Sequence, residues 1–69
     1  MHRIDFSDDR KTAESVLAIE SSKIPDLIAK LTKAKHLSIV MGNLNRLAEH
    51  HTDQELGRRA LRHLGFLDD

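Results

Sequence analysis

The chain has 69 residues, with 11 Lys and Arg balanced by 11 Asp and Glu, and with no cysteine. This length fits one domain spanning residues 1–69, and the lack of cysteine excludes disulfide bonds and cysteine-based zinc sites. The sequence has no apolar run of about 18 residues, so we predict no membrane-spanning segment. No signal-peptide pattern is visible near the start, and we therefore expect a cytoplasmic protein.

Leucine and isoleucine dominate the apolar residues, with ten Leu and five Ile against two Phe and no Trp or Tyr. Leucine favours helices, and the scarcity of aromatic residues disfavours a sheet. We therefore predict an all-α fold, a small helical hairpin or three-helix domain with a long central helix that forms a dimeric bundle. The alternative is an α+β fold in which residues 3–6 and 15–20 form a two-stranded β-ribbon.

The zero net charge conceals a partition along the chain. Residues 1–22 carry a net charge of −2, residues 23–51 carry +3, and residues 52–69 carry −1. Ordinary solvation of the surface explains such a partition. A basic middle segment that meets an acidic partner or nucleic acid explains it as well.

We expect residues 1–7 to form an arm before the first helix. Polar and apolar residues alternate within it, a pattern that fits a short strand or a mobile arm. Ser7, Asp8 and Asp9 are typical of a helix start, because polar side chains cap the first turn and acidic ones complement the helix dipole. We predict a helix over residues 8–21.

The middle of the chain predicts one long helix over residues 24–50. Pro25 suits the first turn of a helix, and apolar residues then recur every three or four positions, as they do on one helical face. A break near residues 35–38 stays open, because Ser38 has a side chain suited to capping a second helix. The apolar positions are Leu27, Leu31, Ala34, Leu37, Met41, Leu44 and Ala48.

The last predicted helix covers residues 52–64. Thr52 and Glu55 have the spacing of a capping box, in which each side chain accepts a hydrogen bond from the backbone amide of the other residue. Gly65 is the expected stop, and the two residues after it are expected to fold back on the helix end.

An apolar stripe of this length exceeds what one short chain is expected to bury, so we predict a homodimer. Motifs typical of nucleophilic catalysis or phosphate binding are not found in the sequence, and we predict no catalytic residue and no cofactor. We expect a non-enzymatic regulatory, adaptor or inhibitor protein that contacts another protein through helical surfaces. The predicted self-association residues are Leu37, Val40, Met41, Leu44 and Leu47.

An alternative function follows from residues 44–64, which resemble a helix-turn-helix segment. Such a segment indicates a small DNA- or RNA-binding regulator, and arginine and glutamine are good readers of base edges. An ion pair between Glu55 and Arg59 would neutralise this row and favour protein contact instead. The residues predicted to contact a partner or nucleic acid are Gln54, Arg58, Arg59 and Arg62.

Three histidines, His50, His51 and His63, lie near the bend before the last helix and near its end. Zinc binds histidine and carboxylate side chains, but no two of these histidines have the i, i+4 spacing that places two ligands on one helical face. We predict no metal site and interpret the histidines as solvated side chains near helix ends. A role for this group stays open.

Overall fold

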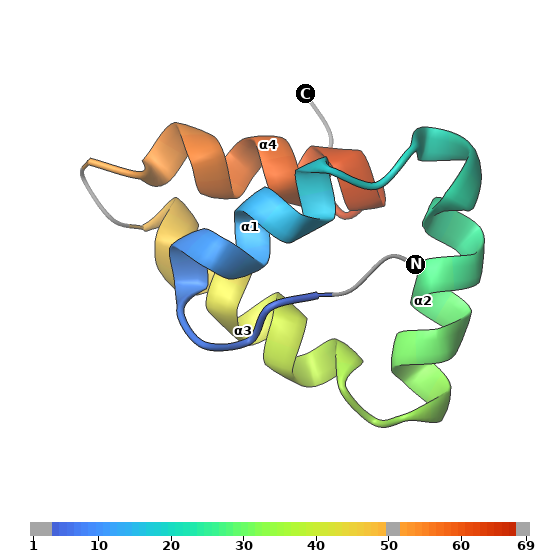
Figure 1. Ribbon diagram of the computed structural model, residues 1–69. Helices are drawn as coiled ribbons and strands as arrows, with labels where there is room; N and C mark the ends of the chain where they lie inside the picture. Colours follow the sequence, from blue (N-terminus) through green and yellow to red (C-terminus); the bar gives the residue numbers. More distant parts are fainter. Residues whose placement is uncertain (1–3, 50–51, 68–69) are drawn as a thin grey trace.

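The computed structural model describes residues 4–49 and 52–67, and the regular structure of this part is all-helical (Figure 1). The predicted all-α class is confirmed. The β-ribbon alternative is wrong, because residues 15–17 belong to the first helix and residues 4–6 form no strand. The elements are, in chain order, α1 (Asp9–Leu17), the 3₁₀ turn η1 (Ser21–Lys23), α2 (Ile24–Lys33), α3 (Leu37–Ala48) and α4 (Gln54–Leu64).

Helix α1 begins one residue after the predicted start and ends four residues before the predicted end. The Asp8 carboxylate accepts a hydrogen bond from the Lys11 amide (2.8 Å), so an acidic N-cap closes the first turn. The helix ends at Leu17 and not at residue 21, because the chain turns there and buries the Ile19 side chain in the core. The segment that follows then leads through η1 to α2.

The helix predicted over residues 24–50 is split near residues 35–38, at the break that the sequence left open, because a turn separates α2 from α3. Lys35 has a φ of 63°, a left-handed conformation that often ends helices. The His36 amide donates to the Leu31 carbonyl (2.8 Å), and the Lys35 amide donates to the Thr32 carbonyl (3.1 Å). These two bonds form a Schellman motif, which satisfies carbonyl groups that the helix end would leave unpaired.

The break lets both halves of the apolar stripe reach one core. A straight helix over the predicted range would be about 40 Å long at about 1.5 Å per residue, whereas the longest dimension of the described residues is 31 Å. Leu31 of α2 and Val40 of α3 instead belong to one buried cluster. The expectation that Ser38 caps the second piece is wrong, because His36 occupies the N-cap position and no side chain caps this helix.

Helix α4 begins without the predicted capping box. Asp53 is the N-cap residue, and no side chain accepts a hydrogen bond from the first turn. The Thr52 hydroxyl lies 3.5 Å from the Asp53 carboxylate instead. The pairing of Thr52 with Glu55 is therefore wrong, because the helix begins one residue too late for that spacing.

Gly65 ends α4 as predicted, with a φ of 87° that glycine adopts without steric cost. The Gly65 amide donates to the Arg62 carbonyl, and the Phe66 amide donates to the Leu61 carbonyl, both at 3.0 Å. This is a second Schellman motif. Leu67 packs against the core beyond it, so the chain folds back at the helix end as expected.

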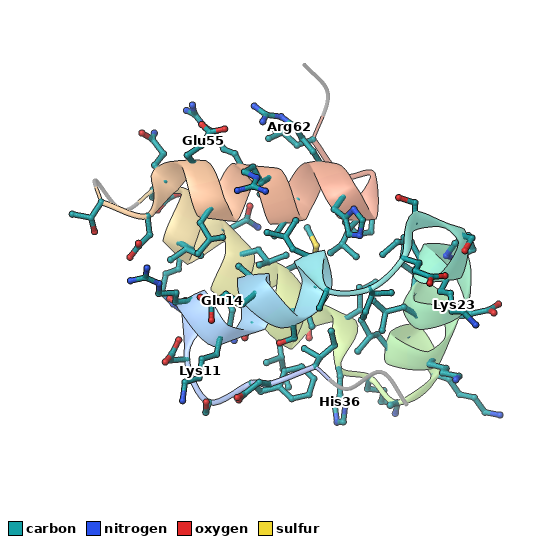
Figure 2. The ribbon with its side chains drawn as sticks, turned by 45° about the horizontal axis from the view of Figure 1, so that its top comes forward. Lys11, Glu14, Lys23, His36, Glu55 and Arg62 are labelled. Atoms are coloured by element: carbon teal, nitrogen blue, oxygen red, sulfur yellow. The ribbon has the colours of Figure 1, made fainter. Side chains whose placement is uncertain are left out.

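Helices α1, α3 and α4 pack against one another around the core, whereas α2 stands at the edge of the molecule (Figure 1). Helix α2 contributes Ile24 and Leu31 to the core and leaves much of its surface open. Charged side chains such as Glu55 and Arg62 lie on the outer side of α4 (Figure 2). The largest fully buried side chains of the described residues are Leu44, Val16, Val40 and Thr12.

A polar network joins α1 to α3 inside this bundle. The Asn43 amide group donates to the Thr12 hydroxyl (3.0 Å), and both side chains are buried. The Arg46 guanidinium donates to the Asn43 side-chain oxygen and makes two bonds of 2.9 Å to the Asp9 carboxylate. Hydrogen bonding to Asp9, and then its negative charge, raises the pKa of Arg46. The buried amide therefore has partners on both of its ends, as buried polar groups require.

The described helices are short. The longest, α3, has 12 residues, whereas a membrane-spanning helix needs about 20. Within residues 4–49 and 52–67, no helix combines the length and the apolar character needed to cross a bilayer.

Candidate interaction groove

An arm of residues 4–7 forms one wall of a groove and is hydrogen-bonded to α1. The Asp5 carbonyl accepts from the Thr12 hydroxyl (2.7 Å), and the Asp5 amide donates to the Ser15 hydroxyl (3.0 Å). The Ser7 amide donates to the Asp5 carboxylate (2.9 Å), and hydrogen bonding to Ser7 lowers the pKa of this carboxyl group. Residues 1–3 of the predicted arm lie outside the described residues.

Helix α2 forms the opposite wall. Pro25 occupies its first turn, where the missing amide hydrogen costs no helical bond. Leu31 is buried, Leu27 is half-buried and Ala34 is exposed. These three residues follow one another at spacings of four and three, so the side of α2 that they share is apolar.

The turn after α2 closes one end of the groove. The Schellman motif places His36 beside the arm, where its ring meets the Phe6 ring edge to face, with centroids 5.4 Å apart and planes at 68°. Such T-shaped pairs are favourable because the edge of one ring is electropositive and the face of the other is electronegative. Phe6 nevertheless remains 37% exposed.

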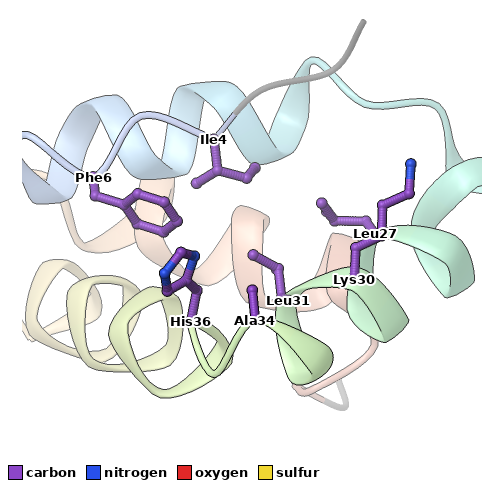
Figure 3. A pocket seen from close by; sticks show the side chains of 7 residues that line it. All are labelled: Ile4, Phe6, Leu27, Lys30, Leu31, Ala34 and His36. Carbon is purple, nitrogen blue, oxygen red and sulfur yellow. The ribbon is translucent and has the colours of Figure 1, made fainter.

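The groove between these walls has a volume of about 440 Å³. Figure 3 shows the arm residues Ile4 and Phe6 on one side, facing Leu31 and Ala34 of the α2 side across the open space. Apolar side chains make most of the surface, and two lining residues carry polar groups. The seven lining residues are Ile4, Phe6, Leu27, Lys30, Leu31, Ala34 and His36.

The charged side chains fall into two sets. The ion pairs that join described residues use arginine, namely Arg10 with Glu14 and Asp53, Arg46 with Asp9, and Arg62 with Glu55. No ion pair within the described residues uses a lysine of the segment around the groove. These exposed lysines are Lys23, Lys30, Lys33 and Lys35.

Most of the predicted self-association residues lie inside one chain. Val40 and Leu44 are fully buried and Leu47 is 3% exposed, whereas Leu37 and Met41 are half-buried. A second chain cannot contact the first three side chains unless the fold opens. The stripe that motivated the homodimer is therefore largely covered by α1 and α4 of the same chain, and the homodimer itself stays a prediction.

The row predicted to contact a partner or nucleic acid lies on α4. Gln54, Arg58 and Arg59 are exposed, and Arg62 is half-buried. The Arg62 guanidinium lies 3.4 Å from the Glu55 carboxylate, so Glu55 pairs with Arg62 and not with Arg59 (Figure 2). Arg58 and Arg59 take part in no ion pair within the part of the chain that the structure describes.

The histidines do not come together in the described structure. His63 is hydrogen-bonded through Nε2 to the Ile19 carbonyl (2.5 Å), and this bond ties α4 to the segment after α1. His50 and His51 lie outside the described residues. Among residues 4–49 and 52–67, no group of three His, Asp or Glu side chains is placed to hold a metal ion.

Comparisons of the chain with protein-family models, curated proteins and solved structures give no match. The candidate groove therefore rests on the geometry of this chain alone. Sequence reasoning missed the groove, because its lining comes from three separate segments, residues 4–6, 27–34 and 36. One signal was present, since alternation places Ile4 and Phe6 on the same side of the arm.

Proposed function

We propose that the chain is a small non-enzymatic regulatory or adaptor protein of the cytoplasm, and that it acts by protein–protein contact through the groove between the arm and α2. The observation that carries this proposal is the apolar lining of an open groove at the edge of the molecule. A concave, mostly apolar surface of this volume is a form that binding sites commonly take. Five of the seven lining side chains are apolar, which suits binding better than acid–base chemistry.

The size and stiffness of the groove fit the docking of a few side chains. A volume of about 440 Å³ accommodates two or three large apolar side chains of a partner and is far smaller than a domain. Hydrogen bonds to Thr12 and Ser15 hold the arm at Asp5, so one wall is already in place before a partner arrives. A wall that is already ordered lowers the entropy cost of binding.

Two exposed alanines, Ala29 within α2 and Ala34 directly after it, provide a matched test. Ala34 lines the groove, whereas Ala29 is exposed on another side of α2. Ala34→Trp fills the groove, and Ala29→Trp adds the same side chain outside it. Each variant and the wild-type chain would be immobilised in a pull-down from the native cell extract, with and without nuclease.

The proposal expects a captured protein that survives nuclease treatment, disappears with Ala34→Trp and remains with Ala29→Trp. Circular dichroism on both variants checks that each is folded. Equal capture by the two variants, or capture that nuclease abolishes, would contradict a role for the groove in protein contact.

A second candidate function, the binding of DNA or RNA through α4, is favoured by one observation. Arg58 and Arg59 are exposed and take part in no ion pair within the described residues, so both are open to phosphate groups or base edges. Arg58→Ala and Arg59→Ala would weaken binding in a gel-shift assay, and Arg10→Ala on α1 is the control. Binding would also fall steeply with salt. No shift at low salt would remove this candidate.

A further inference from the structure

We propose that the occupant of the groove is an acidic amphipathic α-helix of a partner protein, with apolar anchors facing the groove and carboxylates facing Lys30 and the other lysines of residues 23–36. This proposal rests on the function proposed above and adds the chemistry of the partner.

The first argument is the charge of the segment that supplies five of the seven lining residues. Residues 23–36 contain four lysines and one acidic residue, Asp26, which gives a net charge of +3 with histidine neutral. The whole chain has zero net charge, so positive charge is concentrated on this edge of the molecule. Such a patch attracts a partner of the opposite charge and orients it during the encounter.

The second argument is that these lysines have no acidic partner within the described chain. The arginines Arg10, Arg46 and Arg62 make the ion pairs that hold described residues together, and the four lysines make none. Asp26 shares α2 with Lys30, at a spacing of four, yet no ion pair joins the two. The lysines are therefore available to carboxylates from outside.

The third argument concerns which acidic residues lie near the groove. Lys30 is one of the lining residues, and no acidic residue is. Asp5 stands between two lining residues of the arm, but its carboxylate is directed to Ser7 through the hydrogen bond from the Ser7 amide. The rim of the groove therefore favours negative charge on its occupant.

The fourth argument selects a helix over an extended peptide. An extended peptide binds by adding to a strand edge whose amides and carbonyls are free. The arm offers no such edge at Asp5, because its amide and carbonyl already bond to Ser15 and Thr12. The groove is instead walled by side chains, and α2 runs beside it for 10 residues, or about 15 Å. This length matches about three turns of a docked helix with anchors at i, i+3 or i+4, and i+7.

The test uses synthetic peptides and the full chain. The probe is a fluorescein-labelled helical peptide of about 14 residues, with Leu at i, i+4 and i+7 and Glu at most other positions. A second peptide keeps the Leu positions and replaces Glu by Lys, and a third keeps Glu and replaces Leu by Ser. Fluorescence anisotropy measures the binding of each peptide to the wild-type chain.

The acidic amphipathic peptide is expected to bind about tenfold more tightly than its Lys counterpart, because each of two or three exposed ion pairs changes affinity by a factor of about two to three. Its affinity should fall as salt rises. The peptide without Leu should bind at least tenfold more weakly, because the anchors supply most of the buried apolar area.

Two matched variants locate the site. Ala34→Glu places a negative charge inside the groove and should weaken the acidic peptide at least tenfold. Ala29→Glu places the same charge outside the groove and should change its affinity less than twofold. Both positions are exposed, so both variants should fold, and circular dichroism checks this.

The outcomes separate this proposal from the one on which it rests. Equal binding of the acidic and basic peptides, with Ala34→Glu still disruptive, overturns the acidic partner and keeps the groove as a docking site. If no peptide binds, and Ala34→Trp captures as much protein in the pull-down as the wild-type chain does, both the acidic partner and the groove as a docking site are overturned.

The same samples test two other occupants of the groove, a second copy of the chain and a nucleic acid. If the chain is a dimer in analytical ultracentrifugation and Ala34→Glu makes it a monomer, the occupant is a second copy and the proposal is wrong. If a single-stranded oligonucleotide competes with the acidic peptide as well as the unlabelled peptide does, the surface binds polyanions in general and the proposal is again wrong.

Discussion

Gly57 lies where α4 crosses the end of α3, and a single methyl group there tests how closely the two helices approach. A Cβ atom built on Gly57 would lie 2.5 Å from the Ala48 nitrogen, 2.8 Å from the Ala48 Cα and 2.9 Å from the Leu47 carbonyl carbon. All three neighbours are backbone atoms, which cannot move aside by changing a rotamer. Gly57→Ala would force the helices apart by about 0.9 Å to bring the shortest contact to 3.4 Å.

The expected effect is the difference of two opposing terms. Replacing glycine by alanine inside a helix stabilises the helix by about 1 kcal/mol. Overpacking at a close contact costs about 1–3 kcal/mol or more. All three close neighbours are backbone atoms, so we expect the upper part of this range, about 2–3 kcal/mol. The free energy of unfolding then falls by about 1–2 kcal/mol, and the melting temperature falls by about 4–16 °C for a domain of this size.

Gly42 is the matched control, because it lies inside α3 and a Cβ atom there would meet nothing within 4 Å. Gly42→Ala should raise the free energy of unfolding by about 0.5–1 kcal/mol. Urea and thermal unfolding followed by circular dichroism measure both variants. If Gly57→Ala is as stable as Gly42→Ala, the close crossing of α3 and α4 is refuted.

Three further substitutions test the turn, the polar network and the arm. Lys35→Gly should raise the free energy of unfolding by about 1 kcal/mol in urea denaturation, because glycine adopts the observed positive φ without steric cost. A loss of stability in this variant would contradict the left-handed turn. Asn43→Ala should cost about 1–3 kcal/mol, because it leaves the buried Thr12 hydroxyl without its amide partner, whereas exposed Asn45→Ala should stay within about 0.5 kcal/mol. Folding lowers the pKa of Asp5 from its ordinary value of 3.8, so ionised Asp5 stabilises the fold at a pH above that value. This contribution is lost as the pH falls through the lower pKa of the folded state. The urea midpoints of the wild-type chain and Asp5→Asn should therefore differ near pH 6 and converge near pH 2, and a difference that grows in acid would contradict the assignment.

Local signals predicted the outer ends of the fold better than its middle. The acidic N-cap at Asp8 and the glycine stop at Gly65 each act within one turn of helix, so they can be identified without knowledge of the rest of the chain. The turn between α2 and α3 lacked such a signal, because its left-handed residue is Lys35 and not glycine or asparagine. Apolar spacing continued through it, since both helices turn an apolar face to the same core.

The candidate site was predictable only in its charge. The net charge of +3 on residues 23–51 was visible in the sequence, and Lys30, which lines the groove, belongs to that segment. The groove itself depends on the break after α2 and on the hydrogen bonds that hold the arm at Asp5. Side chains distant in the chain become neighbours only through these tertiary features, and hydropathy spacing alone contains no information on them.

The turn at Lys35 connects stability with the proposed interaction. A lysine in the left-handed conformation costs about 1–2 kcal/mol relative to an unstrained residue, and strain of this kind often accompanies a functional site. Lys35 is exposed, lies between the lining residues Ala34 and His36 in the chain, and makes no ion pair within the described residues. Glycine at this position should therefore stabilise the chain and weaken the acidic peptide two- to threefold, whereas alanine should weaken the peptide equally without stabilising the fold. Unchanged peptide affinity in both variants would remove Lys35 from the binding surface and leave its strain without a functional counterpart.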